Sequence, residues 1–330
     1  YPRKGDDMLR PSWLKEAIAA GNEFHFLKQK IWLHNLINIA SLGFVVCAFA
    51  GVMMLGALIP WWAYIPLASV VMGCLVYSLF VLVIHECSHS MYVLLKDREA
   101  SKLLNHRIGA FIGDLLFTNY MEHWAREHTV HHLRPMEEVD RQDGLRFSGK
   151  MWVRKVLLLL IPGFALTINP SRQYGFSLRR TIIGILFFGS IATIGVMTIH
   201  WSVGAAVVWG FNVTGVCNLN KIAQEHGSNL IQMKDPYLRS RTYFYPGRWL
   251  FSPFCINYHF EHHANFNVPW YRLKAYHRRV LQLMPEEFQP YFLTRGLQQA
   301  VQQIAGTRAL PPEAKIFGTS DPSALAQGVV

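Results

Sequence analysis

The chain has 330 residues, of which 51% are hydrophobic, and its 32 Lys and Arg against 21 Asp and Glu give a formal net charge of +11. This length allows one large domain or two small ones. A basic balance would also suit a nucleic-acid-binding protein, but no motif of that class accompanies the charge, so nucleic acid is excluded as a partner. The charge instead indicates a face that meets anionic lipid headgroups or acidic partners.

Charged residues are nearly absent from two long stretches of the chain. Between Ile31 and Leu95 the only charged residue is Glu86, and between Thr181 and Asn220 there is none. Two fully buried core hairpins are the alternative, but a soluble fold rarely leaves so long a run uncharged, because surface positions recur on every helical turn. Each stretch is long enough for two spans of about 20 residues. We therefore predict four transmembrane helices, at about 33–58, 62–84, 181–199 and 202–220.

The turns that join the paired spans, near 60–62 and 200–202, lack Lys and Arg. By the positive-inside rule, the three segments that carry these residues lie on the cytosolic side of the membrane. They are 1–30, 85–180 and 221–330. The predicted fold class is therefore an all-α integral membrane protein, in which four transmembrane helices form two hairpins below a cytosolic helical cap. We treat 1–330 as one domain, with both termini cytosolic, in a bacterial inner membrane or the endoplasmic reticulum.

The remaining segments are assigned in chain order. Residues 11–30 suggest short interfacial helices. The N-terminus does not look like a signal peptide, so we expect the first span to act as the targeting signal. The apolar run 156–168 is too short to span comfortably and is placed at the interface. Residues 271–306 are predicted to be helical and amphipathic, and 310–330 to be a loose tail. The five cysteines form no CxxC pair and are interpreted as packing residues in a reducing compartment.

Nine of the 15 histidines fall into a pattern that predicts metal binding. Spacings of three and four residues place side chains on one face of a helix, so each box of histidines can present its imidazoles in one direction. A single HxxxH would equally suit a buried histidine pair, whereas eight or nine buried neutral imidazoles would be costly without a cation between them. The histidines are the pair His85 and His89, the triplet His128, His131 and His132, the single His226, and the triplet His259, His262 and His263.

The number of histidines exceeds what one ion accepts, so two metal ions are implied. Zinc is usually satisfied by four ligands, or by three in a catalytic site. An all-imidazole set suits zinc, iron, copper or nickel. The residue types alone therefore predict a dinuclear, nitrogen-ligated centre without naming its metal.

The three boxes resemble those of the membrane fatty acid desaturase superfamily. They read His85-Glu-Cys-Ser-His89, His128-Thr-Val-His-His132 and Asn257-Tyr-His-Phe-Glu-His-His263. Their surroundings are similar too, with Gln224-Glu-His-Gly227 after the fourth span and Asn267-Val-Pro-Trp-Tyr-Arg-Leu after the last box. The resemblance covers roughly residues 30–280.

The resemblance implies a non-haem diiron site on the cytosolic face, activated by O2 and by electrons from a carrier protein. All nine histidines would then be iron ligands, with His226 as the extra ligand between the fourth span and the last box. The chain shows no fused cytochrome b5-like or reductase segment. We therefore expect a separate ferredoxin or cytochrome b5-type donor with its reductase.

One position departs from the resemblance. Some family members carry an Asn four residues before the extra histidine, where it helps to hold a metal-bound water, whereas this chain has Ile222. Asn218, Asn220 or Gln224 could substitute, or nothing does.

Several polar residues beside the boxes could orient the ligands by accepting the N–H of the distal ring nitrogen. For each acid, a solvated or helix-pairing role is the alternative. The candidates are Glu86, Glu122, Glu127, Glu225 and Glu261, together with Asn257 and His123. The other histidines are expected in interfacial or loop positions, and they are His25, His34, His106, His200 and His277.

The resemblance and the charge map together suggest oxidation of a lipid acyl chain within the bilayer. Our first hypothesis is fatty acid desaturation. The alternatives on the same two irons are hydroxylation, ketolation, or oxidative decarboxylation of a free fatty acid to a terminal alkene. A membrane zinc protein, either a hydrolase or a transporter, is a further alternative, although transport would need ionisable residues within the spans.

Overall fold

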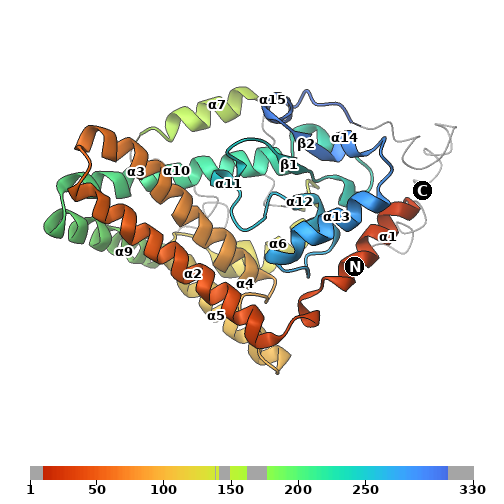
Figure 1. The fold of residues 1–330 in the computed structure, drawn as a ribbon, viewed down its shortest axis with the longest axis horizontal. Coiled ribbons are helices and arrows are strands. Elements are labelled where there is room, and N and C mark those ends of the chain that lie inside the picture. The colour runs from red at the N-terminus through yellow and green to blue at the C-terminus, as the bar shows by residue number, and fades with distance from the viewer. Residues whose placement is uncertain (1–9, 138, 141–148, 162–176, 311–330) are drawn as a thin grey trace.

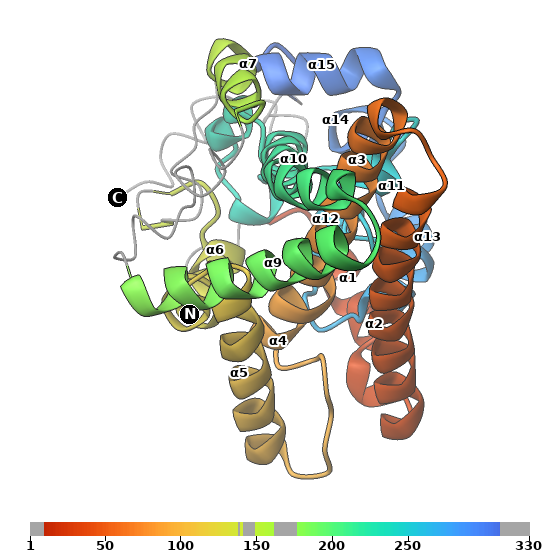
Figure 2. The ribbon, with the colours of Figure 1, turned by 90° about the vertical axis from the view of Figure 1, so that its left-hand side faces the viewer.

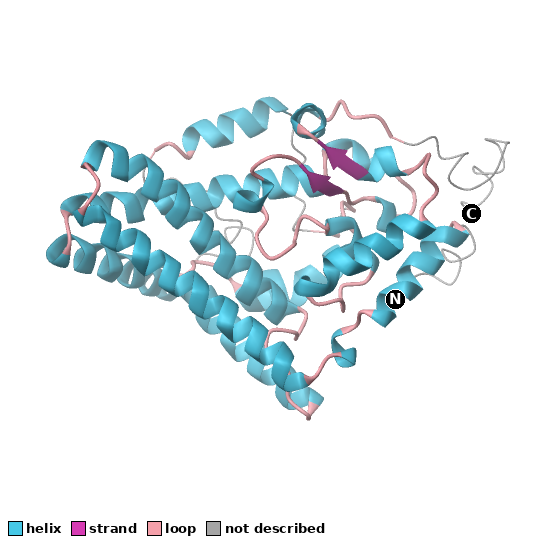
Figure 3. Cartoon of the chain, viewed as in Figure 1, coloured by secondary structure: helices cyan, strands magenta, loops and turns pink. Residues whose placement is uncertain are grey.

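The computed structural model describes residues 10–137, 139–140, 149–161 and 177–310, and within these residues the chain is mostly helical (Figures 1 and 3). Four of its helices are long and apolar enough to cross a membrane, as the charge map predicts. They are α2 (Ile31–Met54), α3 (Trp61–Leu79), α9 (Leu178–Thr198) and α10 (Trp201–Glu225). The turns between α2 and α3 and between α9 and α10 lie together at the left of Figure 1.

The outer pair of these helices, α2 and α9, exposes an extensive apolar surface. In the most apolar 18-residue segment of α2 and of α9, only 11% is buried inside the protein, compared with 67% in the segment that includes α3. Large side chains such as Phe44, Leu186 and Met197 are 63–79% exposed. An apolar surface of this extent marks contact with lipid.

The inner pair, α3 and α10, is held together by small residues (Figure 2). A Cβ added to Gly73 would lie 2.5 Å from the carbonyl oxygen of Gly210, so only glycine permits this approach. The hydroxyl of Thr214 donates to the Gly73 carbonyl at 3.0 Å across the same contact. Small residues with a bridging hydroxyl are the usual means by which helices pack within a membrane.

Both inner helices continue beyond the predicted spans. From α3 the chain runs through a π-helical turn, Phe80–His85, into α4 (Glu86–Ser88). The helix α10 extends five residues past the predicted end at 220. Lys221 and Glu225 form an ion pair at i,i+4 that carries the helix through its first charged residues. The helix α10 is therefore longer than the transmembrane span predicted at 202–220.

The rest of the chain forms shorter elements around the ends of α3 and α10. Before α9 these are α1 (Ser12–Ala20), α5 (Arg98–Leu115), the π-helical turn Tyr120–Arg126, α6 (Glu127–Leu133) and α7 (Gly149–Leu158). After α10 they are β1 (Thr242–Phe244), α11 (Arg248–Phe251), α12 (His259–Ala264), α13 (Leu273–Leu283), α14 (Gln289–Phe292), β2 (Leu293–Arg295) and α15 (Leu297–Ala305).

Two short strands correct the all-α prediction. β1 and β2 pair in parallel, with Thr242 opposite Leu293 (Figure 3). The stretch 271–306, predicted as amphipathic helix, is thus divided among α13, α14, β2 and α15. Gly296, with φ +91°, begins the turn from β2 into α15, because such a backbone conformation suits glycine alone. The predictions for 1–9, 162–168 and 311–330 fall outside the described residues.

Aromatic side chains of α1 and α14 pack against α12. Trp13 of α1 stacks on Phe260 of α12 with ring centroids 6.4 Å apart, and Phe260 contacts Phe292 at 5.3 Å. The hydroxyl of Tyr276 in α13 donates to the carbonyl of Ala17 at 2.7 Å. The N-terminal helix therefore fixes the position of the last histidine box.

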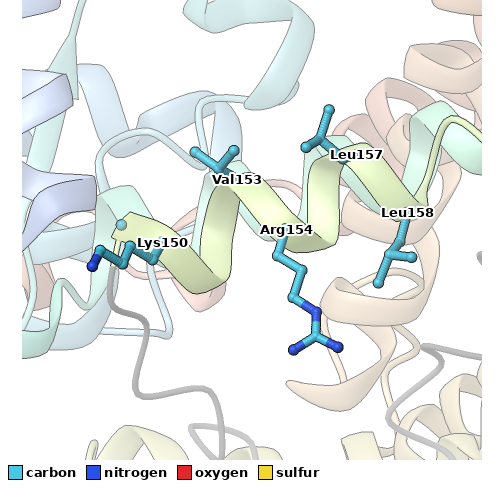
Figure 4. A pocket seen from close by; sticks show the side chains of 6 residues that line it. Lys150, Val153, Arg154, Leu157 and Leu158 are labelled. Atoms are coloured by element: carbon cyan, nitrogen blue, oxygen red, sulfur yellow. The ribbon is translucent and has the colours of Figure 1, made fainter.

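A shallow groove runs along α7, and none of the predicted site residues lines it. Two basic side chains stand there among apolar ones, as Figure 4 shows, which is typical of a helix at a membrane surface. The lining residues are Gly149, Lys150, Val153, Arg154, Leu157 and Leu158.

Candidate metal centre

The nine predicted ligands come together in two adjacent groups. Within each group the potential ligand atoms lie within 4.8 Å of one another, and every member is buried except His89, which is half-buried. The five-histidine group consists of His85, His89, His128, His132 and His262. The four-histidine group consists of His131, His226, His259 and His263.

The histidines occupy the ends of the inner helices and two short helices that meet them. His85 ends the π-helical turn after α3, and His226 follows the last residue of α10. The second and third boxes form most of α6 and α12. The membrane-length helices therefore carry predicted ligands directly.

Each HxxHH box divides its side chains between the two groups. In α6, His128 and His132 belong to the five-histidine group, whereas His131 belongs to the other. In α12, His259 and His263 share one group and His262 joins the other. Consecutive residues on a helix point about 100° apart, whereas residues four apart share a face. The prediction that each box faces one direction was therefore wrong for both triplets.

Ring nitrogens face one another in pairs within each group. The Nε2 atoms are 2.9 Å apart for His85 and His262, 3.2 Å for His128 and His132, and 2.8 Å for His226 and His259. Two nitrogens that each lie about 2.1 Å from one ion are about 3 Å apart when they meet at a right angle. These separations therefore fit ligands of a shared metal ion.

Two further imidazoles have buried ring nitrogens without a hydrogen-bond partner among the described residues. Nε2 of His89 has none, and His263 has none at either ring nitrogen. A buried polar atom without a partner is costly and requires an explanation. Coordination of a cation explains one unpartnered nitrogen of each ring, so the donor set fits the two metal ions that the pattern implies.

Burial keeps these imidazoles neutral. Desolvation, together with the nearby His131, lowers the pKa of His89 to about 3. Desolvation and neighbouring imidazoles also hold the pKa values of His132, His259, His262 and His263 well below the usual 6.5. A neutral imidazole offers the free lone pair that coordination requires.

Three histidines are oriented through the nitrogen that points away from the centre. Nδ1 of His131 donates to Oδ2 of Asp140 at 2.9 Å, and Nδ1 of His226 donates to the Arg239 carbonyl at 2.9 Å. Nδ1 of His85 lies 3.2 Å from Oε1 of Glu86. Such partners fix the tautomer and ring orientation of metal ligands.

Asp140 was missed by the sequence analysis. It lies seven residues beyond the end of α6, and its carboxylate also accepts the backbone N–H of Met136 at 2.9 Å. An acid soon after the second box was the available signal. No helical register connects it to His131, so spacing rules could not single it out.

Two of the other polar candidates, Glu261 and Asn257, contact residues outside the predicted ligands. Glu261 binds Nδ1 of His277 at 2.6 Å and the Thr242 hydroxyl rather than a predicted ligand. Asn257 donates to the Tyr243 carbonyl at 3.2 Å and so supports β1.

Three further candidates lie beside the second box. Glu122 pairs with Arg126 on the exposed surface. Glu127 is half-buried and has no hydrogen bond to a histidine among the described residues. His123 is buried against Trp124 and belongs to neither group.

Two histidines predicted at interfaces or in loops are buried instead. In α2, His34 accepts from the Tyr271 hydroxyl at 2.7 Å and donates to the Met91 carbonyl at 2.5 Å. His277 is held by Glu261. Both rings find partners on distant segments, which a single sequence does not show.

Aromatic rings close the five-histidine group. Phe266 lies against His89 and His132, with centroids 5.2 and 5.3 Å away. Trp124 contacts His128 at 5.1 Å. This wall is apolar and would keep water from the group.

The family model for fatty acid desaturases matches residues 59–295, a range that includes all nine histidines. The chain belongs to the fatty acid desaturase family. No curated protein matches the chain. Family membership and four membrane-length apolar helices mark this desaturase-family chain as a membrane protein with a histidine-rich metal site.

Proposed function

We propose that this desaturase-family protein uses O2 to oxidise an unactivated C–H bond of a fatty acyl or other lipid chain at two iron ions, and that the outcome is desaturation. The observation that carries the proposal is the pair of buried histidine groups at the inner ends of membrane-length helices. A dimetal centre built into such helices can meet a substrate that resides in the bilayer.

Family membership supports iron as the metal, since imidazoles alone would also accept zinc, copper or nickel. The two ions would supply the oxidising power to break an unactivated C–H bond, which no side chain provides. In desaturation the acyl chain loses two vicinal hydrogens. These two hydrogens, together with two electrons and two protons that the substrate does not supply, reduce one O2 to two waters. A ferredoxin or a cytochrome b5-type protein with its reductase is the proposed electron donor.

The protein's own residues orient the ligands and keep the site dry. Asp140 and the Arg239 carbonyl fix the rings of His131 and His226. Phe266 and Trp124 cover the other group with apolar surface. A site without water favours oxidation of the bound chain over side reactions.

The proposed topology places the histidine cap on the cytosolic side, with α2–α3 and α9–α10 as two transmembrane hairpins. The turns between these helices lack Lys and Arg, and the basic residues lie at the other ends. The basic groove on α7 would then lie at the lipid headgroups. Both termini would be cytosolic, in a bacterial inner membrane or the endoplasmic reticulum.

Product analysis tests the proposed reaction. Cells or membranes that contain the protein would receive a defined fatty acid, and products would be identified by gas chromatography and mass spectrometry. We expect an O2-dependent product lighter by two hydrogens, absent with the His262→Ala variant. Only oxygenated products would indicate hydroxylation or ketolation. An alkene one carbon shorter would indicate oxidative decarboxylation. No O2-dependent product from any lipid would contradict the proposal.

Elemental analysis separates iron from zinc. Protein produced without excess zinc should contain about two iron ions per chain, and activity should follow iron content. Stoichiometric zinc with no iron, in protein whose activity does not need O2, would favour a membrane zinc hydrolase instead.

A further inference from the structure

The two histidine groups differ by one histidine, and an acid lies beside one ring of the smaller group. Oε2 of Glu225 is 3.3 Å from Nε2 of His259. That same Nε2 lies 2.8 Å from Nε2 of His226, so it is the nitrogen that faces the four-histidine group. The carboxylate of Glu225 therefore approaches the metal side of His259.

An acid that only orients a ligand would contact the opposite ring nitrogen. Asp140 does so for His131, through Nδ1. Nδ1 of His259 has no hydrogen-bond partner among the described residues. Glu225 thus occupies a different place from an orienting acid.

The carboxylate of Glu225 is buried, with its side chain 1% exposed. Its contacts fix it in place: the ammonium of Lys221 lies 2.5 Å from Oε2, and the hydroxyl of Tyr243 lies 3.4 Å from Oε1. Lys221 compensates the buried negative charge. An oxygen that accepts from Lys221 still has a second lone pair for another partner.

The amide nitrogens of neighbouring residues on α10 donate elsewhere, while Oε1 of Gln224 has no hydrogen-bond partner among the described residues. Asn220 donates to the Tyr245 hydroxyl at 2.7 Å, and Gln224 donates to the Ala300 carbonyl at 3.0 Å. Ile222, at the position where some relatives have Asn, offers no polar atom. Among these α10 side chains, Glu225 is the one whose oxygen contacts a ring nitrogen of the four-histidine group.

We infer that Glu225 is a carboxylate ligand of the metal ion in the four-histidine group, which gives that ion four nitrogens and one oxygen against five nitrogens for its neighbour. The inference rests on the proposed dimetal centre and adds a ligand to it. The carboxylate places one negative charge on this ion alone, so the two ions become chemically distinct. Lys221 then competes with the ion for the same oxygen.

Metal binding by the full-length protein in detergent tests the assignment without relying on turnover. Metal-depleted protein would be titrated anaerobically with Fe²⁺, and ⁵⁷Fe-loaded protein examined by Mössbauer spectroscopy. The variants are Glu225→Gln, which preserves shape, and Glu225→Asp, with Lys221→Met as the matched control. Lys221→Met breaks the ion pair but leaves the carboxylate.

We expect Glu225→Gln to weaken binding of one of the two ions by about 100-fold or more, above the 10- to 100-fold loss typical of groups that only support a metal ligand, and to change one of two iron signals. Glu225→Asp should retain part of the affinity, and Lys221→Met should leave it unchanged or raise it.

Two results would overturn the assignment. One is two-ion binding and spectra of Glu225→Gln like those of the wild type, which would leave only a hydrogen bond between Glu225 and His259. The other is an equal loss of affinity in Glu225→Gln and Lys221→Met, which would make the ion pair structural. A wild-type protein that binds no metal would instead contradict the proposed function. Thermal unfolding would show whether each variant folds, and Glu225→Asp provides the test if Glu225→Gln does not.

Discussion

The two histidine groups share helices α6 and α12 but are held in different ways. In the four-histidine group, His131 and His226 each donate from Nδ1 to an oxygen at 2.9 Å, and the carboxylate of Glu225 adjoins a third ring. In the five-histidine group, Glu86 provides the carboxylate contact, and aromatic rings cover the rest.

This difference suggests a division of labour between the two metal positions. Hydrogen bonds to fixed oxygens favour a rigid, tightly bound ion. An aromatic wall gives less directional support but offers an apolar surface that an acyl chain can approach. We therefore expect the four-histidine group to hold its ion more tightly and the five-histidine group to lie nearer the substrate.

The largest effects should come from removing one ligand of each group. His262→Ala and His263→Ala should each lower product formation more than about 100-fold, because losing a ligand costs more than losing a supporting contact. Metal analysis should show fewer than two ions per chain. The control is His25→Ala, which lies outside both groups. Full metal content in either ligand variant would contradict the assignment of that residue.

A comparison of two single histidines sharpens the boundary of the site. His226→Ala should lower metal content and activity as severely as His262→Ala. His200→Ala should leave both nearly unchanged, because this ring caps α10 at its other end, where it accepts the Ser202 N–H at 3.3 Å. Loss of that cap should cost about 1 kcal/mol of stability. Turnover like the wild type in the His226 variant would show that it is not a ligand.

The oxygens behind the ligands should have intermediate effects that differ between the groups. Asp140→Asn keeps the shape but removes the charge that His131 contacts, and should weaken one ion about 10-fold or more. Glu86→Gln should have a smaller effect, since its contact with His85 is longer, at 3.2 Å. Iron titrations of the two variants would test this order, and a larger loss in Glu86→Gln would reverse the comparison.

Acid should weaken the metal-free protein gradually. The pKa of His89 is lowered to about 3 in the folded state, against about 6.5 in the unfolded chain. Between these values the unfolded chain binds more protons, so stability is fully present above pH 6.5 and decreases as the pH falls toward 3. The midpoint of thermal unfolding at pH 7.5, 6.0 and 5.0 would show the trend. A constant midpoint would contradict the burial of neutral imidazoles.

Hydropathy and histidine spacing predicted the four long helices and eight of the nine members of the two groups, because charge-free runs and i,i+3 or i,i+4 spacings leave a direct trace in the sequence. The ninth member, His226, stands alone in the sequence and was assigned through the family resemblance. The full length of α10 was not predicted. A charged residue ends an apolar run in the sequence, whereas Lys221 and Glu225 form an ion pair in the folded helix.

Contacts between distant segments could not be predicted. Asp140 reaches His131 through a turn, and β1 pairs with β2 about 50 residues further along the chain. The division of each HxxHH box between two groups was in principle accessible from helical geometry. It requires treating the middle residue of the box separately from the outer pair.

The close approach of Gly73 and Gly210 has a consequence for handling this protein. The predicted ligand His85 follows α3 and the predicted ligand His226 follows α10, so the spacing of these two helices sets the spacing of the histidines they carry. A soluble fragment made by deleting the apolar helices would lose the scaffold that aligns the centre. Detergents or lipids that separate these helices should release metal before the cap unfolds, so metal retention offers a sensitive measure of a good solubilising condition.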